Sequence, residues 1–331
     1  MPTSSLEQYT QSARYFNIDG FKLAYWQHLP DSTVDSTVDR TVDRTSDHTS
    51  DHTSERLSEK AAPQQTIVFI HGFPSASWDW HHQWQALKHR AGVSYQLIAL
   101  DMLGFGLSAK PYPHQYQLVD QARYIKALLA RLQITQCHLF AHDYGDSVAQ
   151  ELLHLAETGQ TEFAIQSLTY LNGGLFSESH RPLLTQKLLL SPLGNWLVKL
   201  LSKRSLATSF HKIFGPDTPP AQHDIDTLWQ LLQHQQGTRA MPGLIRYIPE
   251  RAKRRADWLR AMQTTQTPQL FINGAHDPIS GEHMRQRFTT LVPQGKTVSL
   301  PVGHYPQIEA PEAVLQHFCE FNFFLNIKLS C

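Results

Sequence analysis

The sequence has little cysteine, no excess charge of either sign and no long apolar run, and each absence narrows the class of protein. Three cysteines among 331 residues are too few for a disulfide framework, so we expect a reducing compartment, the cytoplasm. The 29 Lys and Arg equal the 29 Asp and Glu, which gives no argument for binding nucleic acid. No stretch reaches 18 apolar residues, and the N-terminal segment lacks a signal-peptide pattern. We therefore expect neither a membrane span nor secretion.

Residues 31–58 consist of seven degenerate tetrads, DSTV DSTV DRTV DRTS DHTS DHTS ERLS. They contain only four large apolar residues, which is too little apolar surface to offset the entropy of ordering the segment. We predict a disordered insert. The repeated Asp is no calcium array, because the glycines that allow tight ligand turns are missing.

Outside the tetrads, short apolar runs alternate with helical periods. Residues 15–27 read as a hairpin with Asp19-Gly20 at its turn. Further strands are predicted at 66–70, 96–101, 137–142, 167–172, 269–274 and 297–302, and helices at 78–90, 117–133, 145–157 and 311–325. This order predicts an α/β fold whose mostly parallel sheet is flanked by helices.

The alternation is interrupted between residues 175 and 262, where only amphipathic helical patterns occur. We predict a core domain formed by residues 1–174 and 263–331, with 175–262 as an inserted all-helical lid over the strand ends. The lid holds 13 Lys and Arg against 6 Asp and Glu, including RAKRR at 251–255. A charge run of this kind usually lies on a solvated helix face, but it can also contact anionic lipid or a protein.

The segment FAHDYGDSVAQELL carries the sharpest chemical signal. A strand ends at His142, Asp143 follows, and a helix begins at once, with small residues at Ala141 and Gly145. Small neighbours are needed where a chain reverses in a strained strand-to-helix turn, the nucleophile elbow. Asp143 stands where such elbows usually carry serine. The alternative is that Asp143 only caps the helix.

Two downstream loops favour the catalytic alternative. Asp277 follows one predicted strand in LFINGAHDP, and His304 follows the next in LPVGHYPQIEAP. The order nucleophile, acid, base along the chain is the one that elbow-containing hydrolases use. Because the chain holds 19 histidines, His304 stands out only through its position.

Two glycine-containing loops follow other strands. In FIHGFPSASWDW the backbone N–H of Phe73, with that of Tyr144, is placed to form an oxyanion hole, and Phe73-Pro74 is a candidate cis peptide. Residues 104–109, GFGLSA, match a loose dinucleotide fingerprint, but Pro111 and Pro113 prevent a helix from starting there. We expect a structural loop in which Asp101 accepts hydrogen bonds from nearby amides, and no NAD.

The motifs HGFP, DMLGFGLSAKP, HDYG, HDP and GHYPQIEAPE resemble the epoxide hydrolase and haloalkane dehalogenase branch of the α/β-hydrolases. Within that branch, LNGGLFSESHRPLLTQKLL and FGPDTPP are similar to the mesoderm-specific transcript proteins. The resemblance covers residues 15–29 and 64–325. It implies an α/β-hydrolase fold with Asp143, Asp277 and His304 as the catalytic residues, and neither a cofactor nor a metal.

An aspartate nucleophile limits the reaction. A carboxylate is already ionised at neutral pH and suits attack on a saturated carbon, which gives a covalent alkyl ester. His304, oriented by Asp277, would then activate water to cleave that ester. A serine-type esterase is a weaker alternative, because no GxSxG occurs in the chain.

The leaving group separates the possible activities. Epoxide hydrolases of this branch protonate the opened ring from lid tyrosines, and the lid holds one, Tyr247. Dehalogenases hold the halide with indole or amide N–H groups, and the corresponding places here hold Tyr144 and Phe73. The lid tryptophans at 196, 229 and 258 are expected to pack in the core. Epoxide hydrolysis is therefore favoured over dehalogenation, and a non-catalytic member of the fold that binds a ligand or partner stays open.

We expect a small apolar substrate, because the lid helices are apolar. Tyr247, Trp78 and His142 are the candidates for the pocket wall. Asp146 is unusual at a place where Gly or Ala is more common. It is expected to interact with the helix dipole, to raise the pKa of Asp143 or to repel anionic substrates. No pattern in the sequence fixes the oligomeric state.

Overall fold

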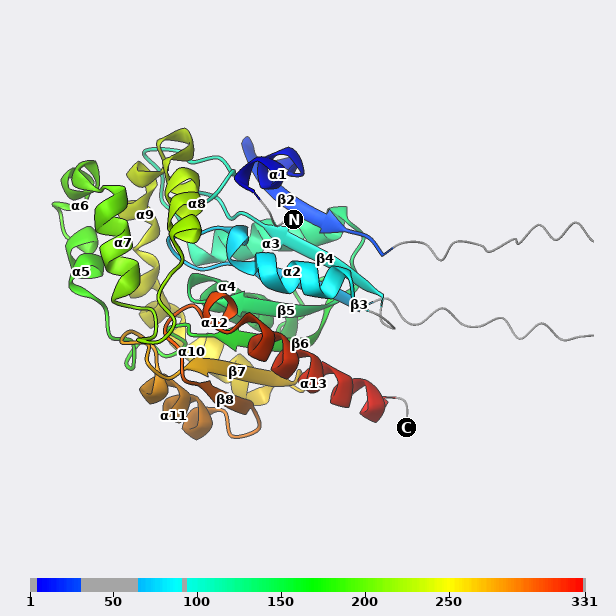
Figure 1. Ribbon diagram of the computed structural model, residues 1–331. Coiled ribbons are helices and arrows are strands. Elements are labelled where there is room, and N and C mark those ends of the chain that lie inside the picture. The colour runs from blue at the N-terminus through cyan, green and yellow to red at the C-terminus, as the bar shows by residue number, and fades with distance from the viewer. Residues whose placement is uncertain (1–4, 31–64, 91–93, 330–331) are drawn as a thin grey trace, which may run out of the picture.

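The computed structural model describes residues 5–30, 65–90 and 94–329 and shows the expected eight-stranded, mostly parallel sheet (Figure 1). The strand order is β1-β2-β4-β3-β5-β6-β7-β8. The strands are β1 (Arg14–Ile18), β2 (Phe21–His28), β3 (Gln65–Ile70), β4 (Tyr95–Leu100), β5 (Gln136–His142), β6 (Ala164–Leu171), β7 (Gln269–Gly274) and β8 (Lys296–Leu300). All pairs from β4 to β8 are parallel. The fold class expected from the sequence is confirmed.

The N-terminal hairpin is also confirmed. β1 pairs antiparallel with β2, and Ile18 faces Phe21 across a two-residue turn. Asp19 and Gly20 both have positive φ, 51° and 79°, which is the backbone that an Asp-Gly hairpin turn requires. The tetrads at 31–58 lie outside the described residues.

Helices cover both faces of the sheet, and successive strand residues point to opposite faces. In β3, Val68 and Ile70 pack into one apolar cluster, and Ile67 and Phe69 pack into the other. The first cluster lies under α3 (Leu118–Arg131), α4 (Tyr144–Glu157) and α11 (Glu282–Leu291). The second lies under α1 (Leu6–Gln11), η1 (Ser77–Trp80), α2 (His81–Lys88), α12 (Pro306–Glu309) and α13 (Pro311–Leu329). The sequence patterns did not predict α1, α11 and α12.

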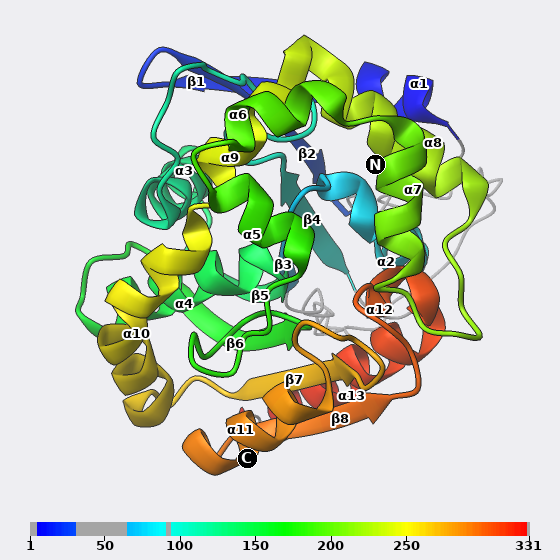
Figure 2. The same cartoon turned by 90° about the vertical axis from the view of Figure 1, so that its left-hand side faces the viewer.

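The segment between β6 and β7 is helical, and its residues 175–262 contain no strand. Its elements are α5 (Leu184–Leu190), α6 (Gly194–Leu197), η2 (Val198–Leu200), α7 (Lys203–His211), α8 (Gln222–Gln233), η3 (His234–Ala240), α9 (Met241–Leu244) and α10 (Tyr247–Thr264). Helices α5–α9 gather at one end of the sheet, and Figure 2 shows them in front of the strands. Among the described residues, no helix is long and apolar enough to cross a membrane.

Candidate active site

Asp143 occupies a strained turn between β5 and α4. Its φ of 47° and ψ of −103° are unusual for a residue other than glycine, which is a cost that surrounding structure must offset. The turn brings α4 against β3, since a Cβ on Gly145 would lie 2.4 Å from the carbonyl oxygen of Ile70. The small residue that the sequence pattern required at position 145 is therefore needed for backbone clearance.

The carboxylate of Asp143 is buried and contacts the loop after β3. The Phe73 N–H donates a hydrogen bond of 3.1 Å to Asp143 Oδ2, and the Phe73-Pro74 peptide is cis, as expected. The second expected donor, Tyr144 N–H, is the first amide of α4 and adjoins Asp143 in the chain. Burial alone would raise the pKa of Asp143, but the positive charges of His304 and Arg251 outweigh it and lower that pKa.

His304 and Asp277 form a buried pair, as the sequence order of their loops predicts. The imidazole Nδ1 of His304 donates to Asp277 Oδ2 at 2.8 Å, and the backbone N–H of His304 donates to the carbonyl of Ile213 at 2.7 Å. Ile213 lies in the insertion, so the insertion helps to position the histidine loop. Burial opposes a charge on His304, but the carboxylates of Asp277 and Asp143 raise its pKa to about 9.

Asp277 is held by several donors besides His304. Asn172 Nδ2 donates to Asp277 Oδ2 at 2.9 Å, and Ser280 Oγ donates to the same oxygen at 2.8 Å. The Ile279 N–H donates to Oδ1 at 2.8 Å. Burial alone would raise the pKa of Asp277, but His304 and these donors lower it to about 2. Asn172 follows β6 directly. A polar residue at the carboxyl end of a strand could have been predicted as part of the site, but the sequence analysis did not name it.

The structure corrects the position predicted for the Arg251 side chain. It belongs to the RAKRR run, interpreted as a solvated face, yet its side chain is only 2% exposed. Its Nη2 donates to the backbone oxygen of Asp143 at 3.0 Å and lies 3.6 Å from Asp143 Oδ1, while its Nε donates to Ser147 Oγ at 2.6 Å. Its Nη1 is buried and has no partner among the described residues. The correction follows from packing, because α10 lies against α4 and turns Arg251 inward.

The other arginines of this run are also paired. Arg254 contacts Glu151 at 2.7 Å, and Arg255 contacts Glu178 at 2.5 Å. The three arginines therefore attach α10 to neighbouring elements, and Lys253 is the exposed member of the run.

Two of the three candidate wall residues lie beside Asp143, and one does not. Tyr247 is buried under Arg251, whose guanidinium lies 4.4 Å above its ring, and Tyr247 Oη has no partner among the described residues. His142 precedes Asp143, and its Nε2 donates to the backbone oxygen of His304 at 2.8 Å. Trp78 instead packs edge-on against Tyr9 and stacks on His81. None of these three residues is part of the cavity wall described below.

Asp146 is fully buried, and its Oδ2 has no hydrogen-bond partner among the described residues. Burial and then the charge of Asp143 raise the pKa of Asp146 well above its usual value. The like-charge effect expected from the sequence therefore falls on Asp146, whereas the pKa of Asp143 is lowered. Gly173 gives the Asp146 side chain its room, since a Cβ there would lie 2.1 Å from Asp146 Oδ2.

A cavity of about 290 Å³ connects the site with the insertion. Phe73 and His304 are part of its wall, and the remainder includes Leu189 of α5, Leu200 of η2 and Leu206 of α7. Its surface is mainly apolar, which suits the small apolar substrate expected from the sequence.

The GFGLSA loop has the structural role that was expected. Asp101 accepts hydrogen bonds from the Ser77 N–H at 2.8 Å and the Leu107 N–H at 2.7 Å. A Cβ on Gly106 would lie 1.9 Å from Asp101 Oδ2, so the loop requires glycine there. No helix starts on this loop, and α3 begins only at Leu118.

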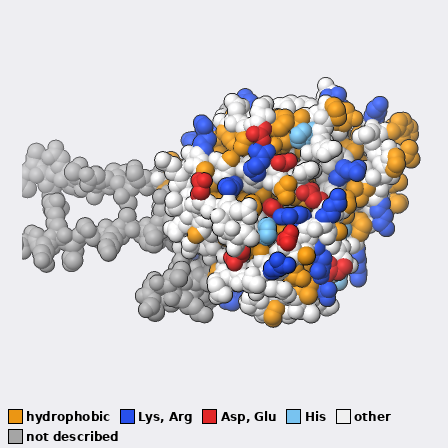
Figure 3. All heavy atoms as spheres, turned by 180° about the vertical axis from the view of Figure 1, so that it is seen from behind, with side chains coloured by type: hydrophobic (Ala, Val, Ile, Leu, Met, Phe, Trp, Pro, Cys, Tyr) orange, Lys and Arg blue, Asp and Glu red, His pale blue; other side chains and the backbone are white. Residues whose placement is uncertain are grey.

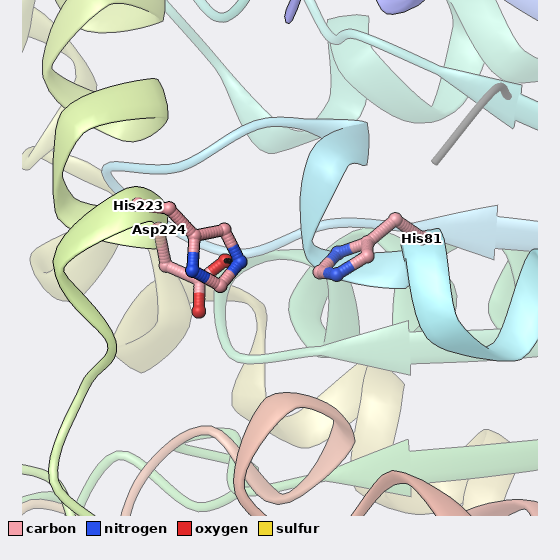
Figure 4. A group of neighbouring side chains, drawn as sticks. All are labelled: His81, His223 and Asp224. Carbon is pink, nitrogen blue, oxygen red and sulfur yellow. Dashed lines mark ion pairs between the residues drawn. The ribbon is translucent and has the colours of Figure 1, made fainter. Parts of the chain in front are cut away.

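One group among the described residues is placed to hold a cation, although the sequence gave no reason to name a metal ligand. It consists of His81, His223 and Asp224, whose ligand atoms lie within 4.8 Å of one another. Figure 4 shows His223 and Asp224 at the start of α8, with the ring of His81 turned toward them from the start of α2. Nε2 of His223 is also 3.2 Å from Asp224 Oδ1, so the two pair when His223 is protonated. These residues lie on helices and are separate from the strand ends that carry Asp143 and His304.

Comparison with known proteins agrees with this geometry. Residues 67–317 match the model of the alpha/beta hydrolase family. The mesoderm-specific transcript protein of Mus musculus is 37% identical over 269 residues, which cover 78% of each chain. Both findings confirm the resemblance seen in the motifs.

Solved structures show the same fold at low identity. The haloalkane dehalogenase DbeA-M1 loop variant from Bradyrhizobium elkanii has a TM-score of 0.72 at 17% identity and covers 96% of this chain and 98% of its own. The epoxide hydrolase CorEH has a TM-score of 0.66 at 16% identity and covers 93% of this chain and 97% of its own.

Proposed function

Because the chain belongs to the alpha/beta hydrolase family, we propose that it is a hydrolase whose nucleophile is the carboxylate of Asp143. The proposed reaction passes through a covalent alkyl ester, and the proposed substrate is a small apolar epoxide. The observation that carries the proposal is the buried Asp143 carboxylate in the elbow, with the Phe73 N–H on Oδ2 and Arg251 beside Oδ1. In this proposal residues 175–262 act as the lid of the site.

In the first step Asp143 Oδ1 attacks a ring carbon of the epoxide, and the carbon–oxygen bond of the ring breaks. The leaving oxygen needs a proton donor, since an alkoxide is a poor leaving group. Tyr247 Oη is a buried proton donor without a partner among the described residues. The neighbouring Arg251 Nη1 stays protonated and can add a hydrogen bond that the sequence did not predict. In this proposal Tyr247 gives its proton to the leaving oxygen, and Arg251 stabilises the negative charge that develops there.

In the second step water attacks the ester carbonyl carbon, and His304 takes its proton. Forming the ester removes the charge of Asp143, which is one cause of the raised pKa of His304. Alkylation therefore favours the neutral imidazole that a general base requires. The negative charge that develops on Oδ2 is stabilised by the N–H groups of Phe73 and Tyr144. The bond between the carbonyl carbon and the original Oδ1 then breaks, His304 returns its proton to that oxygen, and the diol leaves with it. The carboxyl group keeps the oxygen of water, and its proton restores Tyr247.

Dehalogenation is the second candidate, and one observation favours it. Arg251 Nη1 is a buried cationic donor without a partner close to Asp143, and such a group can hold a departing halide. Tyr144 and Phe73 still offer no indole or amide side chain at the places where dehalogenases hold halide. Epoxides therefore stay the first choice.

The test is a panel of small epoxides and haloalkanes with the wild type, Asp143→Ala and His304→Gln. Ester hydrolysis in His304→Gln is expected to slow by about 10²–10⁴-fold, so the intact protein should gain the mass of the alkyl group. A single turnover in oxygen-18 water should label Asp143 and leave the first product unlabelled. Turnover by Asp143→Ala would refute the mechanism. A wild type without turnover or adduct on the whole panel would favour a protein that only binds its ligand.

The leaving-group donor is tested by a pair of tyrosine variants. Tyr247→Phe is expected to slow epoxide opening by about 10²-fold, because general acid catalysis is lost. Tyr144→Phe is the matched control, since its hydroxyl is also buried without a partner and its ring lies 5.0 Å from that of Tyr247. Equal losses in both variants would argue against Tyr247 as the donor.

A further inference from the structure

Exposed large apolar side chains are concentrated on one part of the helical insertion. Eight such side chains occur among the described residues, and five of them lie between residues 184 and 200. They are Leu184 (71% exposed), Leu188 (40%), Leu193 (61%), Trp196 (59%) and Leu200 (62%). We call these five the apolar face. Trp196 was expected to pack in the core, and this expectation was wrong.

The elements that carry the apolar face are apolar on their inner side as well. Leu189, Leu197 and Leu201 line the cavity, while Leu184 and Trp196 point outward. A surface helix normally carries polar residues on the side away from the core. Contiguous exposed apolar residues mark a surface that contacts another apolar body.

The charged residues in the stretch of sequence that carries the apolar face are all basic. Residues 179–216 contain six Lys and Arg, at positions 181, 187, 199, 203, 204 and 212, and no Asp or Glu. Lys203 pairs with Asp226, but no ion pair is formed by Lys187, Lys199 or Arg204 within the described part of the chain. Figure 3 shows orange and blue side chains together at the end of the molecule where α5 and α6 lie.

The apolar face is continuous with the cavity. Leu188 and Leu200 are both exposed on the outer surface and part of the cavity wall. The same wall reaches inward to Phe73 and His304. An apolar molecule at the apolar face therefore meets an apolar route to the site.

We propose that the apolar face docks on an anionic lipid surface and that the cavity takes its apolar substrate from that lipid phase. The second half of this proposal rests on the proposed function. Leucines and a tryptophan surrounded by lysines form the pattern with which short helices bind in the lipid interface. A second copy of the chain is a poorer partner, because a two-fold contact would bring the same unpaired lysines together. The helices are too short to span, so the contact is peripheral.

The first test measures binding of the full chain to sedimented vesicles of phosphatidylcholine, alone or mixed with phosphatidylglycerol. Binding is expected to the anionic vesicles and to fall when salt is raised, since salt screens the lysines. Lys187→Glu and Lys199→Glu should each weaken partitioning by at least about fivefold. Trp196 is the only one of the seven tryptophans that is exposed, so vesicles should shift its emission to the blue.

The second test separates docking from folding and catalysis. The variant Leu184→Ser/Leu193→Ser/Trp196→Ser removes outward side chains that do not line the cavity and should abolish vesicle binding. Leu29→Ser is the matched control, because Leu29 is 53% exposed elsewhere and its loss should leave binding unchanged. Turnover of a dissolved epoxide should be equal in both variants, whereas turnover of a vesicle-borne epoxide should fall only in the triple variant.

Two outcomes overturn the docking proposal. One is a wild type that binds neither vesicle type. The other is a wild type that does not bind vesicles but forms a dimer, with the triple variant remaining a monomer. If dissolved epoxide is not turned over at all, the proposed function fails, and vesicle binding still decides whether the apolar face docks on lipid.

Discussion

At Asp143, burial and neighbouring charge act against each other on one carboxylate. Burial favours the protonated acid, which would be a poor nucleophile, while His304 and Arg251 favour the carboxylate. Their combined effect lowers the pKa of Asp143. Arg251 contributes from a helix of the insertion, so the ionisation of the proposed nucleophile depends on how the insertion packs.

Removing the charge of Arg251 should therefore shift the acid limb of the pH–rate profile for alkylation of Asp143 to higher pH. Asp143 must be ionised to attack, and without Arg251 its pKa rises. In Arg251→Met the acid limb of single-turnover alkylation is expected to move up by about one to three pH units. Arg251→Lys keeps a positive charge and should shift this acid limb less. If the acid limb is unchanged in Arg251→Met, the low pKa of Asp143 is due to His304 and the other neighbours, including the Phe73 N–H, and not to Arg251.

At the scale of elements, the close contact between β3 and the start of α4 fixes the conformation of the turn at Asp143. A Cβ on Gly145 would lie 2.4 Å from the carbonyl oxygen of Ile70 and 2.7 Å from that of His71, and neither backbone atom can move without displacing β3. The elbow therefore tolerates no side chain at this position.

We expect Gly145→Ala to destabilise the protein by about 3 kcal/mol and to reduce alkylation of Asp143, because overpacking shifts the backbone of the turn. Urea unfolding measures the first effect, and intact mass measures the second. Ala156→Ser adds one atom to the same helix at a half-buried position and should change stability little. A Gly145→Ala protein as stable and as reactive as the wild type would contradict this account of the elbow.

At the scale of the whole molecule, the buried charges make folding stability depend on pH. The pKa of His304 is raised to about 9 in the folded protein, against about 6.5 for an ordinary histidine. A raised pKa means that the stabilisation is complete below about pH 6.5 and is lost as pH rises toward 9.

The free energy of unfolding is therefore expected to fall by about 3 kcal/mol from this group alone across that pH window. His304→Gln cannot titrate and should lack this part of the slope. Urea unfolding at several pH values compares the two proteins. Parallel stability profiles would show that the ion pair with Asp277 does not contribute to folding.

The sequence by itself determined the strands along the chain, most helices of the core, the elbow at Asp143 and the places of Asp277 and His304. Period-two and helical patterns are local, and the carboxyl ends of parallel strands meet at one edge of the sheet, so residues far apart in sequence converge there. The same reasoning applied to Asn172 would have found the donor that holds Asp277.

Only the tertiary structure decided which way the side chains of the insertion point. RAKRR reads as a solvated run, yet packing of α10 on α4 buries Arg251 beside Asp143. Trp196 reads as a core residue, yet α6 turns it outward. Helical periodicity defines which residues share a face, but the partner that each face meets depends on how distant segments pack.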